Sequence, residues 1–121
     1  MAFILLADDD AVLATLIREH LEAGGHEVAV AGDGPSAVEQ ARRRRPDLLI
    51  LDVHMPGLSG PEAFKSLDED FTRKTPAIFI SGLPAEEASR QTFLPLWSRG
   101  RLLRKPMDLP KLDATIAELL G

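Results

Sequence analysis

Short apolar runs alternate along the chain with stretches in which apolar residues recur every three or four positions. The apolar runs are predicted strands and comprise residues 2–7, 28–31, 48–51, 77–80 and 102–103. The central run, 48–51, has no polar residue in alternation, which is typical of a strand buried on both faces of a parallel sheet. It ends at Asp52, after which Pro56, Gly57 and Gly60 predict a loop.

The first two intervening stretches predict helices of different character. Asp10 is the expected N-cap of the first helix, and Gly24 is expected to end it. The residues that recur at helical spacing in this helix are Val12, Leu13, Leu16, Ile17 and His20/Leu21. A second helix is predicted over residues 35–44, with Pro35 in its first turn. Its apolar stripe is thin and consists of Ala37, Val38 and Ala41.

Three more helices are predicted in the second half of the chain. The third begins at Pro61 and directs Ala63, Phe64, Leu67 and Phe71 inward. Residues 86–92 predict a fourth, limited by Pro84 and Pro95. The last helix follows residues 102–106 and carries a clear stripe of Leu109, Leu112, Ile116, Leu119 and Leu120.

The alternation of five strands with helices predicts an α/β fold. A parallel sheet covered by helices on both faces follows from this order of elements, and right-handed crossovers leave few topologies. We expect the flavodoxin-like doubly wound arrangement, a five-stranded parallel sheet with strand order 2-1-3-4-5. Its switch point lies between strands 1 and 3, where ligands bind in such sheets.

The composition describes one mildly acidic domain, so we expect residues 1–121 to form a single domain. The net charge of −5 argues against direct nucleic-acid binding, and the basic run Arg42–Arg45 is interpreted as a solvated helix end. The absence of cysteine excludes disulfides and fits a reducing compartment. No apolar run reaches membrane-spanning length and the first residues make a poor signal peptide, so we expect a cytoplasmic protein without membrane insertion.

Carboxylates follow two predicted strands that would be neighbours in this order. Asp8 and Asp9 follow the first strand and Asp52 ends the third, so the three would meet at the switch point, with Ser81 and Lys105 on the same rim. Like charges this close raise each other's pKa, and Mg²⁺ would relieve the repulsion. Asp9 and Asp52 are the expected direct ligands, and Asp8 is expected to bind through water.

Together these side chains predict a phosphoryl site. Asp52 would be the nucleophile that forms an aspartyl phosphate, while Mg²⁺ and Lys105 would neutralise the phosphoryl oxygens and the Ser81 hydroxyl would donate to one of them. Taken singly, the residues have plainer explanations: Asp52 as a turn former, Asp8–Asp10 as helix caps, Lys105 as a surface charge and Ser81 as a turn hydroxyl. Their joint position on one rim favours the phosphoryl site.

These residues lie in motifs that resemble a response-regulator receiver domain of bacterial two-component signalling. The matching segments are Leu6–Asp10, Asp52–Gly60, Ile80–Gly82 and Lys105–Pro106, in the order and near the spacing of that family. The resemblance covers essentially the whole chain. It fits a single-domain regulator, which Met1 directly before the first strand favours, or the receiver of a hybrid histidine kinase.

The resemblance implies a donor and a metal. A histidine kinase or a histidine phosphotransfer protein would present a phosphohistidine, from which Asp52 takes the phosphoryl group. Mg²⁺ would be held by Asp9, Asp52 and the backbone carbonyl of His54. The bond between Lys105 and Pro106 would be cis.

The resemblance also implies a switch. Ser81 would move toward the phosphate and change a face formed by the fourth helix, the fifth strand and the last helix, to which a downstream protein binds. Leu102 stands where the family often has a switching aromatic residue, so the coupling differs here. Residues 83–99 depart from the family pattern, and we expect a shortened helix and loop whose Phe93 and Trp97 either cover part of this face or fill the core.

Three classes of function are compatible with such a site. A phosphoacceptor module would not be an enzyme beyond self-catalysed phosphotransfer and autodephosphorylation. An aspartyl-phosphate hydrolase typically needs a second acid two residues after the nucleophile, where this chain has His54. A phosphorylation-independent interaction module should have lost at least one site residue. Retention of all of them favours the phosphoacceptor.

Overall fold

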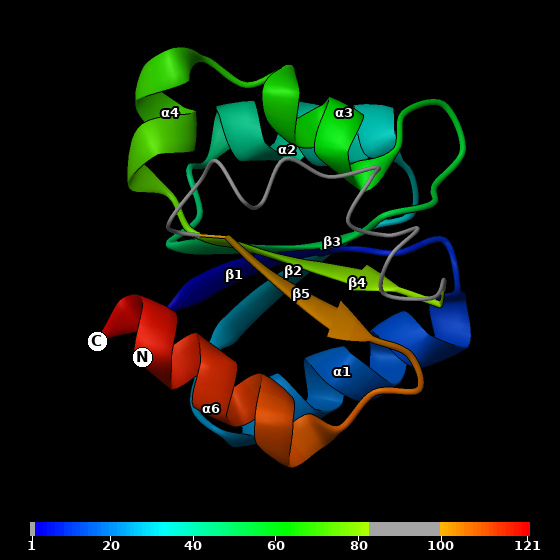
Figure 1. Cartoon of the computed structure of the whole chain (residues 1–121), viewed down its shortest axis with the longest axis vertical. Coiled ribbons are helices and arrows are strands. Elements are labelled where there is room, and N and C mark those ends of the chain that lie inside the picture. Colours follow the sequence, from blue (N-terminus) through cyan, green and yellow to red (C-terminus); the bar gives the residue numbers. More distant parts are fainter. Residues whose placement is uncertain (1, 83–99) are drawn as a thin grey trace.

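The computed structural model describes residues 2–82 and 100–121 and has a central parallel sheet (Figure 1). The strands are β1 (Phe3–Ala7), β2 (Glu27–Ala31), β3 (Leu48–Asp52), β4 (Ala77–Ser81) and β5 (Gly100–Arg104). The described helices are α1 (Ala11–Ala23), α2 (Gly34–Arg43), α3 (Gly60–Lys65), α4 (Glu69–Lys74) and α6 (Leu109–Leu120). Every strand pair is parallel and the order is β2-β1-β3-β4-β5, which confirms the predicted topology.

Helices cover both faces of the sheet. In Figure 1, α2, α3 and α4 lie on one side and α1 and α6 on the other. Because side chains alternate along a strand, each inner strand contributes side chains to two hydrophobic cores, one on each face of the sheet. Leu49 and Leu51 of β3 pack under α2 and α3, whereas Leu48 and Ile50 pack under α1 and α6. All five residues of β3 are buried, as the unbroken apolar run predicts.

Each described helix begins at a short polar residue that accepts a hydrogen bond from the first turn. These N-caps are Asp10, Asp33, Ser59, Asp68 and Asp108. Ser59 and Glu62 form a complete capping box. The predicted cap at Asp10 is therefore confirmed, and its carboxylate accepts from the amides of Val12 and Leu13 at 3.1 Å.

The stripe whose spacing predicted α1 is only partly buried. Val12 and Leu16 are 82% and 52% exposed, and the buried positions are Ala14, Ile17 and Leu21. Leu13 is half-buried against the same core. A stripe at positions 14, 17 and 21 has the same helical period as the predicted one, but it lies on a neighbouring arc of the helix.

The third predicted helix is divided into α3 and α4. The break occurs because the Asp68 carboxylate accepts the amide hydrogen of Phe71 at 2.8 Å and starts a new helix. The inward-facing residues predicted for this segment are nevertheless buried: Ala63, Phe64, Leu67 and Phe71.

The fifth strand is longer than predicted, and the helix expected at 86–92, with Phe93 and Trp97, lies outside the described residues.

Each arginine of the basic run Arg42–Arg45 at the end of α2 contacts neighbouring residues. Arg42 donates to the Ser66 carbonyl at 3.0 Å, and Arg43 pairs with Glu39 on its own helix. Arg44 stacks 3.8 Å over the Phe3 ring and pairs with Glu27, while Arg45 lies 4.7 Å over the Phe71 ring and pairs with Asp70. The run is solvent-exposed, as predicted, but it also ties α2 to the sheet and to α4.

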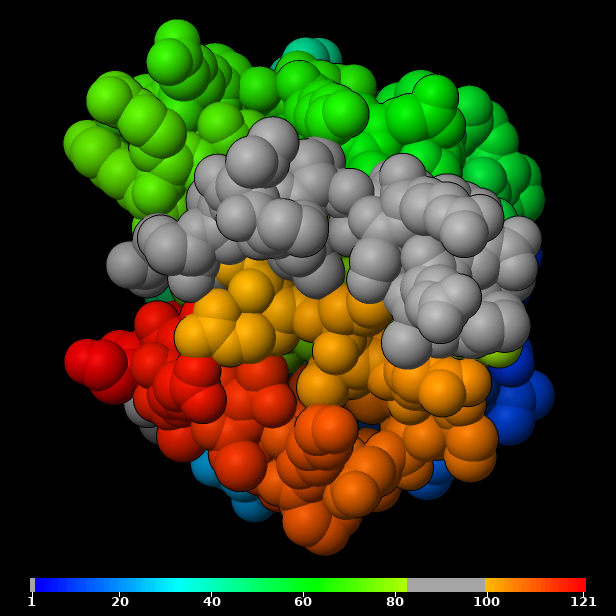
Figure 2. All heavy atoms as spheres, in the orientation of Figure 1, coloured from blue at the N-terminus to red at the C-terminus, as the bar shows by residue number. Residues whose placement is uncertain are grey.

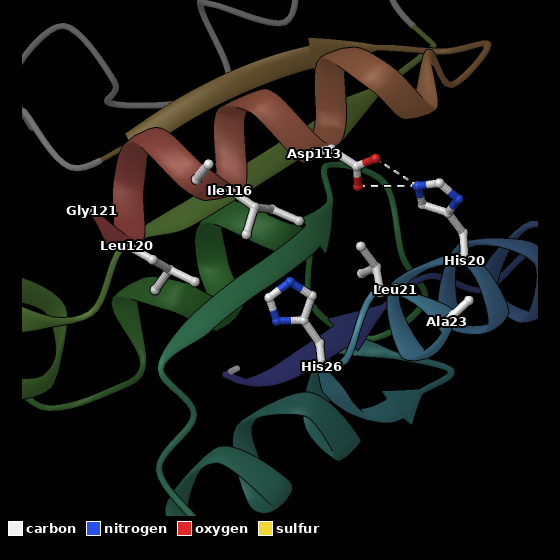
Figure 3. A pocket seen from close by; sticks show the side chains of 10 residues that line it. His20, Leu21, Ala23, His26, Asp113, Ile116, Leu120 and Gly121 are labelled. Carbon is white, nitrogen blue, oxygen red and sulfur yellow. Dashed lines mark hydrogen bonds and ion pairs between the residues drawn. The ribbon is translucent and has the colours of Figure 1, made fainter.

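A surface hollow of about 610 Å³ lies between the C-terminal end of α1 and the helix α6 (Figure 3). His20 points from α1 toward Asp113 of α6, and its Nε2 lies 2.8 Å from Asp113 Oδ2. His26 lies on the far side of the hollow and accepts the Ala2 amide hydrogen at 3.3 Å.

Among the described helices, none has both the length and the apolar character needed to cross a membrane.

Candidate functional site

Three aspartates gather where β1 and β3 end. Ala7 lies opposite Leu51 in the paired strands, so Asp8 and Asp52 follow as neighbours at the carboxyl edge of the sheet. One carboxylate oxygen from each of Asp8, Asp9 and Asp52 lies within 4.8 Å of the others. Asp8 and Asp52 are only 1% and 4% exposed, whereas Asp9 faces solvent. The predicted convergence of these acids is present.

Backbone amides orient the two buried carboxylates. Asp8 Oδ1 accepts the amide hydrogen of Asp10 at 2.9 Å, and Asp52 Oδ1 accepts that of His54 at 3.2 Å. Both contacts join an aspartate to the residue two positions further on, which is the Asx-turn pattern of a strand that runs into a loop. Sequence reasoning used only the carbonyl of His54 and missed its N–H. An aspartate at a strand end followed by a loop was the available signal.

Lys105 supplies the positive charge of the site. Its Nζ lies 3.1 Å from Asp52 Oδ2 and 3.4 Å from Asp8 Oδ2, and its side chain is 26% exposed. Burial alone would lower the pKa of Lys105, but hydrogen bonding and attraction to the two carboxylates outweigh burial and raise it. Lys105 therefore stays an ammonium group directed at both acids.

The Asp8 carboxyl is strongly affected by its buried position. Burial raises the pKa of its carboxyl from 3.8 to about 6, reinforced by Asp52 and opposed by the Asp10 amide and Lys105. Its Oδ2 atom is buried and makes no hydrogen bond within the described residues. One lysine thus only partly compensates the buried acids.

The remaining predicted residues lie at or near this rim. Ser81 ends β4, is fully buried, and its carbonyl accepts the Lys105 amide hydrogen at 2.8 Å. The Lys105–Pro106 peptide bond is cis. The His54 side chain is exposed. Leu102 does not reach the rim, because it lies within β5 opposite Phe79 and packs half-buried against the core under α2 and α3.

The donor set fits a hard divalent cation. Mg²⁺ prefers carboxylate and carbonyl oxygens, keeps several waters, and is usually bound by one or two carboxylates. Asp8, Asp9 and Asp52 offer only such oxygens. Asp8 Oδ2 pairs with Lys105 but makes no hydrogen bond within the described residues, so it is an additional buried acceptor that a metal-bound water could satisfy.

A five-stranded parallel α/β sheet with clustered acids and one lysine at its carboxyl edge defines the class of signalling receiver modules. The family model described as "Response regulator receiver domain" matches residues 4–117. The chain therefore belongs to the response-regulator receiver family. Membership supports phosphoacceptor signalling in a two-component system, and receiver domains of this kind generally act as signalling modules rather than enzymes.

Individual relatives agree with this assignment. The polar-differentiation response regulator DivK of Brucella anthropi is 31% identical over 98% of this chain and 95% of its own. The transcriptional regulatory protein CrdR of Helicobacter pylori is 37% identical over 93% of this chain, but the match spans only 52% of CrdR. The chain therefore spans about half the length of that relative.

Solved structures show the same fold. The chemotaxis protein CheY4 of Vibrio cholerae aligns with a TM-score of 0.87 and 27% identity, covering 99% of both chains. The receiver domain of the hybrid histidine kinase CckA aligns with a TM-score of 0.81 and 30% identity, covering 98% of this chain and 99% of that one.

Proposed function

We propose that residues 1–121 form one cytoplasmic receiver domain, which accepts a phosphoryl group on Asp52 from the phosphohistidine of a histidine kinase or phosphotransfer protein. The observation that carries the proposal is the surroundings of Asp52. Its buried carboxylate lies 3.1 Å from an ammonium nitrogen and within 4.8 Å of the oxygens of two other acids. A carboxylate at a strand end beside a cation is suited to attack phosphorus.

The transfer step follows from this geometry. An Asp52 oxygen attacks the phosphorus of phosphohistidine, an O–P bond forms, and the N–P bond breaks with its electron pair going to the imidazole, which takes up a proton. Lys105 holds its charge beside Asp52 throughout and would stabilise the phosphoryl oxygens. The Ser81 hydroxyl would donate to one of these oxygens.

The metal would be held by Asp9, Asp52 and the His54 carbonyl, with Asp8 binding through water. When bound, Mg²⁺ would neutralise negative charge on the transferring phosphoryl group. The neighbouring His54 amide keeps the Asp52 carboxylate oriented at 3.2 Å. The same site residues would support slow autodephosphorylation.

The output would be read by a downstream protein rather than by nucleic acid. We propose that Ser81 and Leu102 are the switch residues of a face that includes β5 and α6. Figure 2 shows these two elements side by side on one face of the molecule, and Arg101 of β5 pairs with Glu118 of α6. The third part of the proposed face, helix 86–92, lies outside the described residues.

Intact mass after incubation with a small-molecule phosphodonor tests the proposal. The wild-type chain should gain one phosphoryl group only when Mg²⁺ is present, and Asp52→Asn should gain none. Glu62→Gln, an exposed acid in the α3 capping box, is the matched control and should react like the wild type.

A folded wild-type chain that gains no phosphoryl group with Mg²⁺, from either the small donor or a phosphohistidine protein, would contradict the proposal. That result would favour the alternative, a phosphorylation-independent interaction module on a receiver scaffold.

A further inference from the structure

The first turn of α2 packs against the loop that carries His54. Gly34 opens α2 and contacts this loop so closely that a Cβ atom there would lie 2.4 Å from the Leu58 carbonyl oxygen and 2.5 Å from Leu58 Cβ. The Gly34 amide also points at the Pro56 carbonyl at 3.4 Å. Two backbones therefore meet where only glycine fits.

In a second contact, the glycine belongs to the loop and its neighbour belongs to α2. Gly57 has a φ of +83°, and a Cβ on it would lie 2.9 Å from Pro35 Cδ. The pair Gly34–Pro35 thus packs against the pair Gly57–Leu58, with a glycine on each side. We call this contact the α2–loop clamp.

The far end of the same loop is fixed against Asp52 itself. A Cβ on Gly60 would lie 2.4 Å from the Asp52 carbonyl oxygen, and the Gly60 amide donates to the Val53 carbonyl at 3.0 Å. Between this anchor and the α2–loop clamp lies His54, whose amide donates to Asp52 Oδ1. The position of the His54 backbone is therefore set by contacts at both ends of the loop.

We infer that Gly34 is a positioning residue for the metal site, acting through the α2–loop clamp on the backbone of His54. The inference rests on the proposed function, in which the His54 carbonyl binds Mg²⁺. A side chain at position 34 would push Leu58 away from α2 and shift the His54 carbonyl and amide relative to Asp52. Displacing a group that supports a metal ligand typically weakens metal binding about tenfold or more.

The chain supplies a matched control within the same turn. Gly32 lies two residues before Gly34, has no positive φ, and a Cβ on it would meet nothing within 4 Å. Gly32→Ala and Gly34→Ala therefore add the same methyl group to the same β2–α2 connection. Only the second would disturb the loop.

The experiment measures Mg²⁺ affinity directly, by titrating Mg²⁺ and following the backbone amide NMR signals of residues 52–60 without any phosphodonor. Gly32→Ala should bind like the wild type, and Gly34→Ala should bind about tenfold more weakly. Phosphorylation of Gly34→Ala should recover at high Mg²⁺ concentration. A purely structural role would lower thermal stability without moving the Mg²⁺ midpoint.

Equal Mg²⁺ affinity in Gly34→Ala and Gly32→Ala would overturn the inference. If Gly34→Ala does not fold, Pro35→Ala takes its place, since it removes the ring next to Gly57 and adds no heavy atom. Unchanged affinity there would overturn the inference as well, and weakened affinity would support it. A wild type that binds Mg²⁺ but accepts no phosphoryl group would contradict the proposed function alone, while one that binds no Mg²⁺ would contradict both.

Discussion

Asp8 is buried beside Asp52, and within the described part of the chain Lys105 is the lysine that faces both carboxylates. Its pKa is raised to about 6, mainly by burial, and its Oδ2 makes no hydrogen bond within the described part of the chain. A carboxyl group whose pKa is higher in the folded chain than in the unfolded chain favours folding when it is protonated. The contribution is fully present below pH 3.8 and is lost as the pH rises through about 6.

Asp8→Asn should therefore stabilise the metal-free protein at neutral pH. The shift from 3.8 to about 6 corresponds to at most about 3 kcal/mol in the free energy of unfolding. The gain should shrink as the pH falls from about 7 toward about 4, because Asp8 then becomes protonated in the wild type too. Urea unfolding without Mg²⁺ across this pH range measures it.

Asp9→Asn is the control for this prediction. Asp9 is the adjacent acid but is exposed, so its replacement should change the free energy of unfolding much less. A wild type that is as stable as Asp8→Asn at neutral pH without Mg²⁺ would show that burial of Asp8 carries no such penalty. Added Mg²⁺ should stabilise the wild type more than Asp8→Asn, because the metal compensates the buried charge.

At the scale of elements, periodicity predicted which segments are helices better than it predicted how they sit. In α1, the predicted and observed stripes share a period, and only packing against the sheet selects the arc with Ala14, Ile17 and Leu21. Apolar residues such as Val12 can be exposed at little cost, so their presence does not fix the buried face. The α3–α4 break was missed because Asp68 was not interpreted as a cap.

Asp68→Ala should destabilise the protein by about 1 kcal/mol, since α4 would lose the acceptor for the Phe71 amide. Asp68→Asn keeps an acceptor oxygen and should cost much less. Glu69→Ala changes the neighbouring acid without removing the cap and serves as the control. Equal free energies of unfolding for Asp68→Ala and Asp68→Asn would contradict the capping role.

At the scale of the whole molecule, the order of elements predicted both the sheet and the convergence of its acids. Strand order 2-1-3-4-5 brings β1 beside β3, where Ile4 pairs with Leu48 although 43 residues lie between them in the sequence. The same pairing brings Asp8 and Asp52 together. The sequence could not reveal how far each acid is buried, or that α2 contacts the loop after β3. The contact of α2 with the loop depends on a close approach of two backbones, for which the glycines are the only sign in the sequence.

The central claim is that Asp52 is the phosphoacceptor among three clustered aspartates. Its most direct test is borohydride reduction of the chain after Mg²⁺-dependent phosphorylation, followed by peptide mass mapping. Reduction converts an aspartyl phosphate to homoserine, and we expect homoserine at position 52 alone. Homoserine at Asp8 or Asp9, or a phosphorylated chain with no conversion at Asp52, would contradict it.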